Sequence, residues 1–230
     1  MSNPDILPSI PEQPVPIQAI IFDLDGLIVD TEALAYQSWV ATFREYGVAL
    51  PRSAYQLDIG TAGKFDSTLE LERLTGKHIP AEQLVATRMA HRERLLVDLP
   101  LLPGVLELVT AAHAAGWPLA VASSSNRVWV EGWLERLGIR RFFQCVRTRD
   151  DVAQIKPAPE LFLAAAACLG IAPEACLVLE DSPPGMFAAA AAGMRCIAVP
   201  NALTIDLPRP PVALTLGSLS ELTLAQLGEL

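Results

Sequence analysis

The sequence predicts an α/β fold: a doubly wound parallel sheet with a small all-helical domain inserted after the first strand. Two observations lead to this prediction. In the second half of the chain, helix-like segments alternate with short, continuously apolar segments. Earlier, a long stretch whose apolar residues recur only at helical spacing separates the first apolar segment from the others. Continuously apolar strands indicate burial on both faces, which is typical of parallel sheets covered by helices.

The alternation runs from residue 105 to residue 199. Helices are expected at 105–115, 128–137, 159–169 and 184–192, and strands at 118–122, 144–147, 176–179 and 195–199. Each helix ends at a glycine, where a positive φ costs little: Gly116, Gly138, Gly170 and Gly193. With a first strand at 19–22, this order predicts a doubly wound sheet.

The stretch 31–98 contains no strand-like segment and is too long for a single crossover helix. We therefore expect residues 31–98 to form a helical cap domain with hinges at 26–30 and 99–103. The remaining segments, 17–30 and 99–230, would form one discontinuous α/β core. Residues 1–16 are rich in proline and have no basic segment followed by an apolar one, so they predict a flexible tail rather than a signal peptide.

Composition excludes several classes of protein. Of the 230 residues, 51% are hydrophobic and 19% charged, which excludes a wholly disordered chain. The 26 acidic and 17 basic residues give a net charge of −9, which argues against nucleic acid as the main partner. No apolar run is long enough to cross a membrane. The four cysteines lie in apolar segments without a CxxC pair, and we interpret them as reduced residues of a cytoplasmic protein.

Polar residues collect where the predicted strands end. Asp23 and Asp25 follow the first strand, and Ser123, Lys156 and the pair Glu180–Asp181 follow later ones. Taken singly, each has an ordinary explanation, since aspartates form turns, serines cap helices and lysines face solvent. Because ligands bind beyond the carboxyl ends of parallel strands, their joint occurrence at one edge favours a functional site.

These residue types suit phosphoryl transfer. The carboxylate of Asp23 can attack phosphorus, and Asp25 can protonate the leaving oxygen and later deprotonate water. Such close carboxylates need a cation, and Asp23 and Asp181, backed by Glu180, offer the hard oxygen ligands that suit Mg²⁺. Ser123 and Lys156 would then hold the phosphoryl oxygens, so that several groups together lower the barrier.

These residues resemble a known family. Phe22–Gly26, Ser123, Lys156–Pro157 and Glu180–Asp181 are similar, in order, to the four motifs of the haloacid dehalogenase superfamily. Residues 30–32, 102–104, 156–160 and 180–182 resemble its β-phosphoglucomutase-like phosphatase group, in which a small helical cap follows the first strand of a Rossmann-like core. The resemblance runs from about residue 18 to residue 200.

The resemblance implies roles for individual residues. Asp23 would be the nucleophile and Asp25 the acid/base. Mg²⁺ would be held by Asp23, the backbone carbonyl of Asp25 and Asp181, with Glu180 in support. Haloacid dehalogenases themselves use no metal and lack the second aspartate, which is present here as Asp25.

The expected function is therefore hydrolysis of a small phosphorylated metabolite by a monomer or weak oligomer, with two alternatives. A β-phosphoglucomutase would carry a phosphate-binding arginine and a histidine in its cap, where this chain has Gly63–Lys64 and Ala35. A regulatory phospho-acceptor would not need the acid/base Asp25.

Substrate contacts are expected from two places. The cap loop 59–64 contains Gly60, Thr61 and Lys64, the last of which is either a substrate partner or an ordinary exposed lysine. On the core side, Ser125 and Asn126 are candidates for substrate binding, with helix capping as the alternative.

Overall fold

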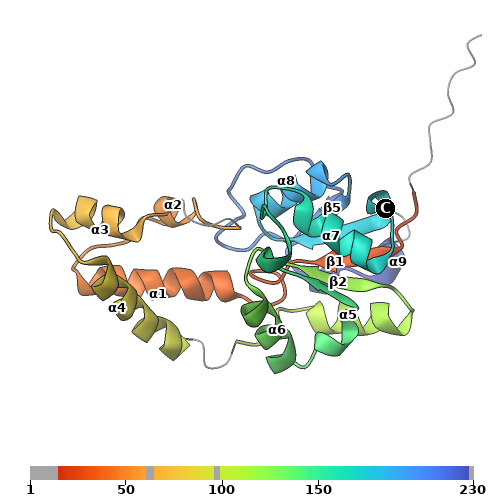
Figure 1. The fold of residues 1–230 in the computed structure, drawn as a ribbon, viewed down its shortest axis with the longest axis horizontal. Helices are drawn as coiled ribbons and strands as arrows, with labels where there is room; N and C mark the ends of the chain where they lie inside the picture. Colours follow the sequence, from red (N-terminus) through yellow and green to blue (C-terminus); the bar gives the residue numbers. More distant parts are fainter. Residues whose placement is uncertain (1–14, 61–64, 96–98, 228–230) are drawn as a thin grey trace, which may run out of the picture.

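A computed structural model of the chain describes residues 15–60, 65–95 and 99–227. Its centre is a parallel sheet of six strands in the order β3-β2-β1-β4-β5-β6 (Figure 1). The bounds of the strands are β1 Ala19–Phe22, β2 Leu119–Ala122, β3 Cys145–Arg147, β4 Cys176–Glu180, β5 Arg195–Ala198 and β6 Leu214–Thr215. The first five confirm the predicted strands to within one residue at each end. The edge strand β6 was not predicted, because one half-buried and one exposed residue leave no apolar pattern.

Helices cover both faces of the sheet, as the doubly wound prediction requires. On one face, Ile20 and Phe22 of β1 pack with α5 (Val105–Ala114) and α6 (Arg127–Arg136). On the other face, Ala19 and Ile21 pack with α7 (Glu160–Leu169) and α8 (Pro183–Ala191). Figure 1 shows these pairs on opposite sides of the strands. Alternate residues of a strand point to opposite faces, so a continuously apolar strand serves two cores.

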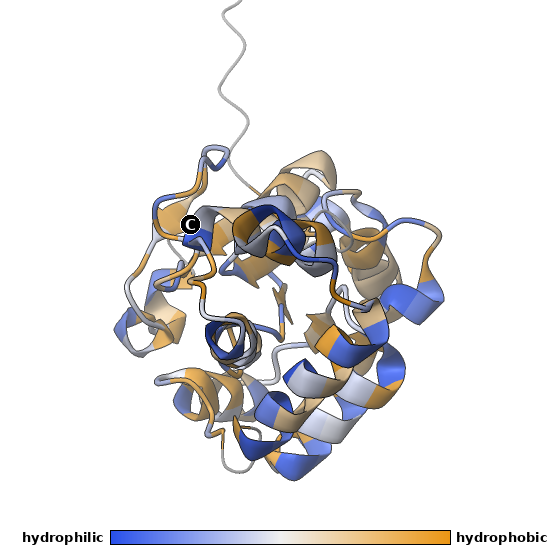
Figure 2. Ribbon diagram, turned by 90° about the vertical axis from the view of Figure 1, so that its left-hand side faces the viewer, coloured by the Kyte–Doolittle hydropathy of each residue, from blue (hydrophilic) through white to orange (hydrophobic). Residues whose placement is uncertain are grey.

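The first four helices after β1 form a separate group beyond one end of the sheet (Figure 1). They are α1 (Thr31–Glu45), α2 (Arg52–Tyr55), α3 (Ser67–Thr75) and α4 (Ala81–Leu95). Their own apolar core includes the fully buried Phe43, Leu71 and Leu84. Figure 2, viewed from this end, shows hydrophilic and hydrophobic residues mixed along the same helices, as expected for a surface layer. A cap domain with boundaries at 31 and 98 stays a prediction.

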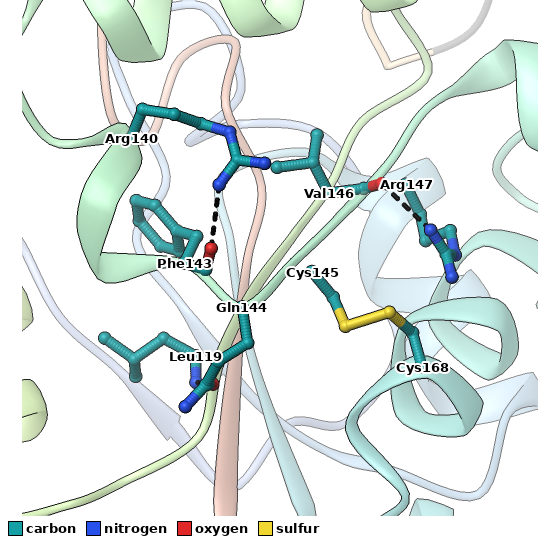
Figure 3. The surroundings of a disulfide bond; sticks show 8 residues. All are labelled: Leu119, Arg140, Phe143, Gln144, Cys145, Val146, Arg147 and Cys168. Atoms are coloured by element: carbon teal, nitrogen blue, oxygen red, sulfur yellow. Dashed lines mark hydrogen bonds between the residues drawn. A yellow bond between two sulfur atoms is a disulfide. The ribbon is translucent and has the colours of Figure 1, made fainter.

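A disulfide corrects the sequence-based interpretation of the cysteines. Cys145 of β3 is bonded to Cys168 of α7 (Figure 3). Cys176 and Cys196 are free and buried. The physical reason is that α7 packs against β3, which brings two cysteines 23 positions apart to a Cα separation of 6.2 Å, within bonding range. No local sequence spacing predicts this disulfide, because only the fold brings the two cysteines together. The argument for a reducing compartment therefore fails for Cys145 and Cys168.

The predicted N-terminal tail lies, up to residue 14, outside the described residues. Within the described ranges, none of the helices is both long and apolar enough to span a membrane.

Candidate active site

Polar side chains meet at the carboxyl ends of β1, β2 and β4. Strand β1 pairs with β2 on one side and with β4 on the other. Strands β2 and β3 are thus added on one side of β1 and the later strands on the other, so the strand order reverses at β1. Asp23 follows β1, Ser123 follows β2, and Glu180 ends β4 with Asp181 next to it. All four side chains are buried. This is the position at which ligands bind to open parallel sheets.

Lys156 joins two of the predicted site residues. Its ammonium group donates hydrogen bonds to Oδ1 of Asp23 and, at 3.1 Å, to Oε1 of Glu180. Glu180 also accepts from the backbone N–H of Asp181 at 2.7 Å and from the hydroxyl of Ser182 at 3.1 Å. The carboxylate of Glu180 is therefore occupied by protein donors and orients its neighbours. Asp23 lines the cavity above it, and its Oδ2 accepts no hydrogen bond from the described residues.

The site has an oxygen without a partner. Carboxylate oxygens of Asp23, Glu180 and Asp181 lie within 4.8 Å of one another. Oδ2 of Asp181 accepts from the side-chain amide of Asn201 at 2.7 Å, but its buried Oδ1 has no hydrogen-bond partner among the described residues. A buried acceptor left unpaired is costly, whereas a metal ion would satisfy it. The residues present therefore fit a divalent cation with hard oxygen ligands.

The electrostatics of this cluster lead to the same conclusion. Burial, together with the charge of Glu180, raises the pKa of both Asp23 and Asp181 well above the usual aspartate range. Burial acts to lower the pKa of Lys156, but the charges of Asp23 and Glu180 outweigh it and raise that pKa. The lysine thus remains protonated and offsets only part of the acidic charge. A bound cation would reverse the upward shifts of the two aspartates.

Asp25 lies among donors instead of carboxylates. Thr31 donates to its Oδ1 at 2.6 Å, and Ser125 and Ser123 donate to its Oδ2 at 2.6 and 3.2 Å. The indole N–H of Trp129 donates to Oδ1 at 2.8 Å. These four donors come from α1, α6 and the loop after β2, so three separate segments fix one carboxyl group near Asp23. The sequence predicts site roles for the two serines, whereas it points to Thr31 only as part of the segment 30–32 and does not point to Trp129.

Comparison with known proteins identifies the family. Residues 20–199 match the model of the haloacid dehalogenase-like hydrolases. The chain belongs to this family.

Two curated members and one solved structure of this haloacid dehalogenase-like hydrolase family illustrate the similarity. YhcW of Bacillus subtilis (strain 168) is 40% identical over 211 residues, which cover 92% of this chain and 96% of that protein. Hexitol phosphatase B of Escherichia coli (strain K12) is 35% identical over 218 residues, covering 91% and 96%. The crystal structure of CbbY from Rhodobacter sphaeroides in complex with phosphate is 31% identical and has a TM-score of 0.74, covering 93% of this chain and 100% of that one.

A cavity of about 830 Å³ lies above Asp23, between the sheet edge and the helices of the 31–95 region. Of the predicted substrate-binding residues, Gly60, Ser125 and Asn126 line it. Thr61 and Lys64 lie outside the described residues. The side chain of Ser125 is engaged with Asp25, and that of Asn126 caps α6 by accepting from the N–H of Trp129 at 2.9 Å.

Gly60 shows why a small residue is needed in this loop. Its φ is +70°, and a Cβ atom added there would lie 2.6 Å from the hydroxyl of Ser182. A side chain would therefore be strained and would collide with the loop after β4. The backbone of the helical layer approaches the sheet edge closely at this point.

The helical layer also contributes cavity residues for which the sequence predicts no role. They are Glu32 and Leu34 of α1 together with Arg88 and Arg92 of α4. Glu32 accepts from the hydroxyl of Tyr55 at 3.0 Å. Burial, and the charge of Asp25 after it, raises the pKa of Glu32 to about 7. In the sequence, Glu32 and Arg88 look like ordinary polar positions of surface helices, and only folding brings them to the cavity that Asp25 also lines.

Proposed function

We propose that the chain is a Mg²⁺-dependent phosphatase that hydrolyses small phosphorylated metabolites through an aspartyl-phosphate on Asp23. The observation that carries the proposal is the pairing of two unlike carboxyl groups. Asp23 is held by Lys156 beside an unpaired oxygen of Asp181, and Asp25 is held separately by four donors. One suits attack on phosphorus, and the other suits proton transfer. The names of relatives such as hexitol phosphatase B support a phosphorylated metabolite as substrate.

In the first step, a carboxylate oxygen of Asp23 forms a bond to phosphorus while the ester P–O bond breaks. Asp25, protonated at this stage, gives its proton to the departing alkoxide, which leaves as an alcohol. Lys156 keeps Asp23 oriented and offsets charge on the phosphoryl oxygens. The hydroxyl of Ser123, which lines the cavity and donates to Asp25, would turn to donate to a phosphoryl oxygen.

In the second step, water attacks the phosphorus of the aspartyl-phosphate. Asp25, now a carboxylate, accepts a proton from this water, and the bond between phosphorus and Asp23 breaks. Inorganic phosphate leaves, and both aspartates return to their starting states. Water reaches the site through the cavity that Asp23 and Asp25 line.

Asp23, Asp181 and the backbone carbonyl of Asp25 would hold the metal, with Glu180 orienting Asp181 and Lys156. When bound, Mg²⁺ neutralises charge that develops on the phosphoryl oxygens.

Hydrolysis is favoured over transfer between two positions of a sugar. Ala35 lines the cavity with a methyl group, at the position where the resemblance would place a histidine of a β-phosphoglucomutase. Without that group, water is the natural acceptor of the phosphoryl group. The mutase alternative predicts conversion of β-glucose 1-phosphate to glucose 6-phosphate in the presence of a bisphosphate primer, and we expect none.

The test is turnover of p-nitrophenyl phosphate with Mg²⁺, with EDTA, and in the variant Asp23→Asn. We expect EDTA to abolish release of p-nitrophenolate and Asp23→Asn to reduce it at least about 10³-fold, because no other group replaces the nucleophile. Glu82→Gln, an exposed acid-to-amide change on α4, is the matched control and should keep full activity. Activity that survives either EDTA or Asp23→Asn would overturn the mechanism.

A further inference from the structure

The cavity above Asp23 has arginines on its walls that the hydrolytic steps do not use. Arg88 and Arg92 reach it from α4, and Arg149 reaches it from the short helix after β3 (Arg149–Asp151). Among the ion pairs of the described residues, none involves any of these three guanidinium groups. The acidic residues of the cavity, in contrast, belong mainly to the sheet edge, where Lys156 already serves two of them.

Arg88 and Arg92 lie one helical turn apart, and both side chains are half-buried. Like charges at this spacing destabilise a helix. Burial lowers the pKa of Arg88, and the charge of Arg92 also acts to lower it, although Tyr55 and the acidic Glu32 and Asp58 act to raise it. The arrangement therefore costs free energy in the unliganded protein, and an anion between the two guanidinium groups would remove that cost.

Both guanidinium groups are held by aromatic faces. Arg92 lies 4.5 Å from the ring centre of Trp129, and Arg88 lies 4.4 Å from that of Trp39. Stacking fixes the plane of a guanidinium group but leaves the N–H donors at its edge free. Arg88 uses one donor, from Nε to the hydroxyl of Ser38 at 3.4 Å, and Arg92 has no hydrogen bond to the described residues. Several donors in this wall are therefore available to a ligand.

The wall lies at a defined position relative to the reaction. The indole that supports Arg92 is the same one whose N–H donates to Asp25, so a single ring separates the guanidinium group from the proposed acid/base. A phosphoester with its phosphorus at Asp23 and its leaving oxygen at Asp25 would extend its remaining atoms toward Arg92. The distal end of the substrate thus meets cationic donors.

We propose that the natural substrate carries a second anionic group, a phosphate or a carboxylate, and that Arg92 and Arg88, with Arg149 at the rim, bind it. The inference rests on the proposed function and narrows its substrate class to doubly anionic phosphoesters. Guanidinium groups match both phosphate and carboxylate oxygens through paired N–H donors. The same contacts explain how a chain of net charge −9 attracts such a substrate.

The test uses p-nitrophenyl phosphate as the reporter substrate and two pairs of phosphoesters as competitors. Fructose 1,6-bisphosphate is compared with fructose 6-phosphate, and 3-phosphoglycerate with glycerol 3-phosphate. In the wild-type protein, the doubly anionic member of at least one pair should have an inhibition constant about tenfold or more below that of its mate. The pair that responds identifies the second group as phosphate or carboxylate.

Variants then assign the effect to the wall. Arg92→Gln should raise the inhibition constant of the doubly anionic compound about tenfold while changing that of its mate far less, and Arg92→Lys should restore part of the difference. Arg94→Gln is the matched control, because Arg94 lies on the same helix, is exposed and does not line this cavity. It should leave the preference intact.

The outcomes separate the two proposals. Absence of any p-nitrophenyl phosphate turnover would overturn the proposed function itself. Turnover with no preference in either pair would overturn the second-anion inference alone. If Arg92→Gln raises the inhibition constants of both members of a pair equally, Arg92 only supports the packing of the helical layer on Trp129, and the inference also fails.

Discussion

At the scale of single residues, the three aspartates of the site differ in their surroundings more than in their position. Asp23 and Asp181 are crowded by other carboxylates, and their pKa values are raised. Asp25 has hydrogen-bond donors on both of its oxygens. These donors fix the orientation of the carboxyl group that must exchange a proton, first with the leaving group and then with water. A group held in place in this way needs no reorganisation when the proton moves.

Trp129 provides a way to test this orientation. Trp129→Phe keeps an aromatic ring but removes the N–H that donates to Asp25. Because a hydrogen bond to a charged group contributes about 1.5–3 kcal/mol, kcat should fall about 10- to 100-fold. KM for p-nitrophenyl phosphate should change much less, since this small ester carries no second anionic group to reach Arg88 and Arg92. An unchanged kcat would show that the other three donors suffice.

Glu32 makes stability depend on pH. Its pKa is about 7 in the folded chain, mainly because of burial, whereas the ordinary glutamate value is 4.5. Between these two values the unfolded chain loses this proton while the folded chain retains it, so stability falls as pH rises from about 4.5 to 7. The variant Glu32→Gln has no proton to lose, and its amide oxygen can still accept from Tyr55.

We therefore expect the stability of Glu32→Gln, relative to the wild type, to increase by about 1–3 kcal/mol between pH 5 and pH 8. Urea unfolding at several pH values, in EDTA to keep metal out, measures the difference. The burial of Asp23 and Asp181 is common to both proteins and cancels, whereas the charge of Glu32, which also acts to raise the pKa of Asp181, is part of the difference measured. Glu82→Gln, at an exposed position, should run parallel to the wild type; a parallel course for Glu32→Gln would contradict the assignment.

At the scale of elements, the start of α8 is fitted to the acidic cluster. Ser182 caps this helix by accepting from the N–H of Gly185 at 3.4 Å, and its own hydroxyl donates to Glu180. A Cβ atom on Gly185 would lie 1.4 Å from Oε1 of Glu180. The helix can therefore approach the end of β4 only because this position lacks a side chain. The carboxylate that orients Lys156 depends on that space.

Gly185→Ala tests the fit of α8 against a matched change in α6. The added methyl group should displace Glu180, lower the stability by about 1–3 kcal/mol, and reduce kcat at least tenfold through Lys156. In Gly132→Ala the new methyl group meets nothing within 4 Å, so helix propensity should instead stabilise the protein by up to about 1 kcal/mol. Urea unfolding and p-nitrophenyl phosphate kinetics measure both. Similar effects from the two variants would refute the packing argument.

The elements also show what a sequence can predict. Each of the strands β1 to β5 is buried along nearly its whole length, so a run of apolar residues suffices to locate it. The site residues that directly follow β1, β2 and β4 are placed by those strands, so locating the strands also locates these residues. The short edge strand β6 has one half-buried and one exposed residue and gives no such pattern.

Residues brought in by tertiary packing could not be predicted in this way. Asn201, which holds Oδ2 of Asp181, lies 20 positions further along the chain in a loop. Arg92 meets Trp129 only because α4 packs near α6. The bond between Cys145 and Cys168 arises likewise from the packing of α7 on β3. In each case the contact depends on how elements dock, and local spacing does not encode that.

At the scale of the whole molecule, folding gathers three buried carboxylates, Asp23, Glu180 and Asp181. The buried Lys156 donates hydrogen bonds to the first two. The apolar strands that place these carboxylates also remove them from water, and burial raises the pKa of the two aspartates. Because these close, buried carboxylates destabilise the folded state, any cation that binds between them stabilises it. Stability and function are thus linked through the same oxygens.

Mg²⁺ should therefore raise the melting temperature of the wild-type protein, and the rise should grow with the logarithm of the Mg²⁺ concentration. At a hundred times the dissociation constant the expected gain is about 2.7 kcal/mol, which for a chain of this size corresponds to roughly 5–10 °C. Asp181→Asn should lose this shift and yet, without metal, melt at or above the wild-type temperature, because it removes one buried carboxylate. Thermal melts with Mg²⁺ and with EDTA give both values without reference to activity. The exposed Glu82→Gln should keep the full Mg²⁺ shift; an equal shift in Asp181→Asn would place the cation elsewhere.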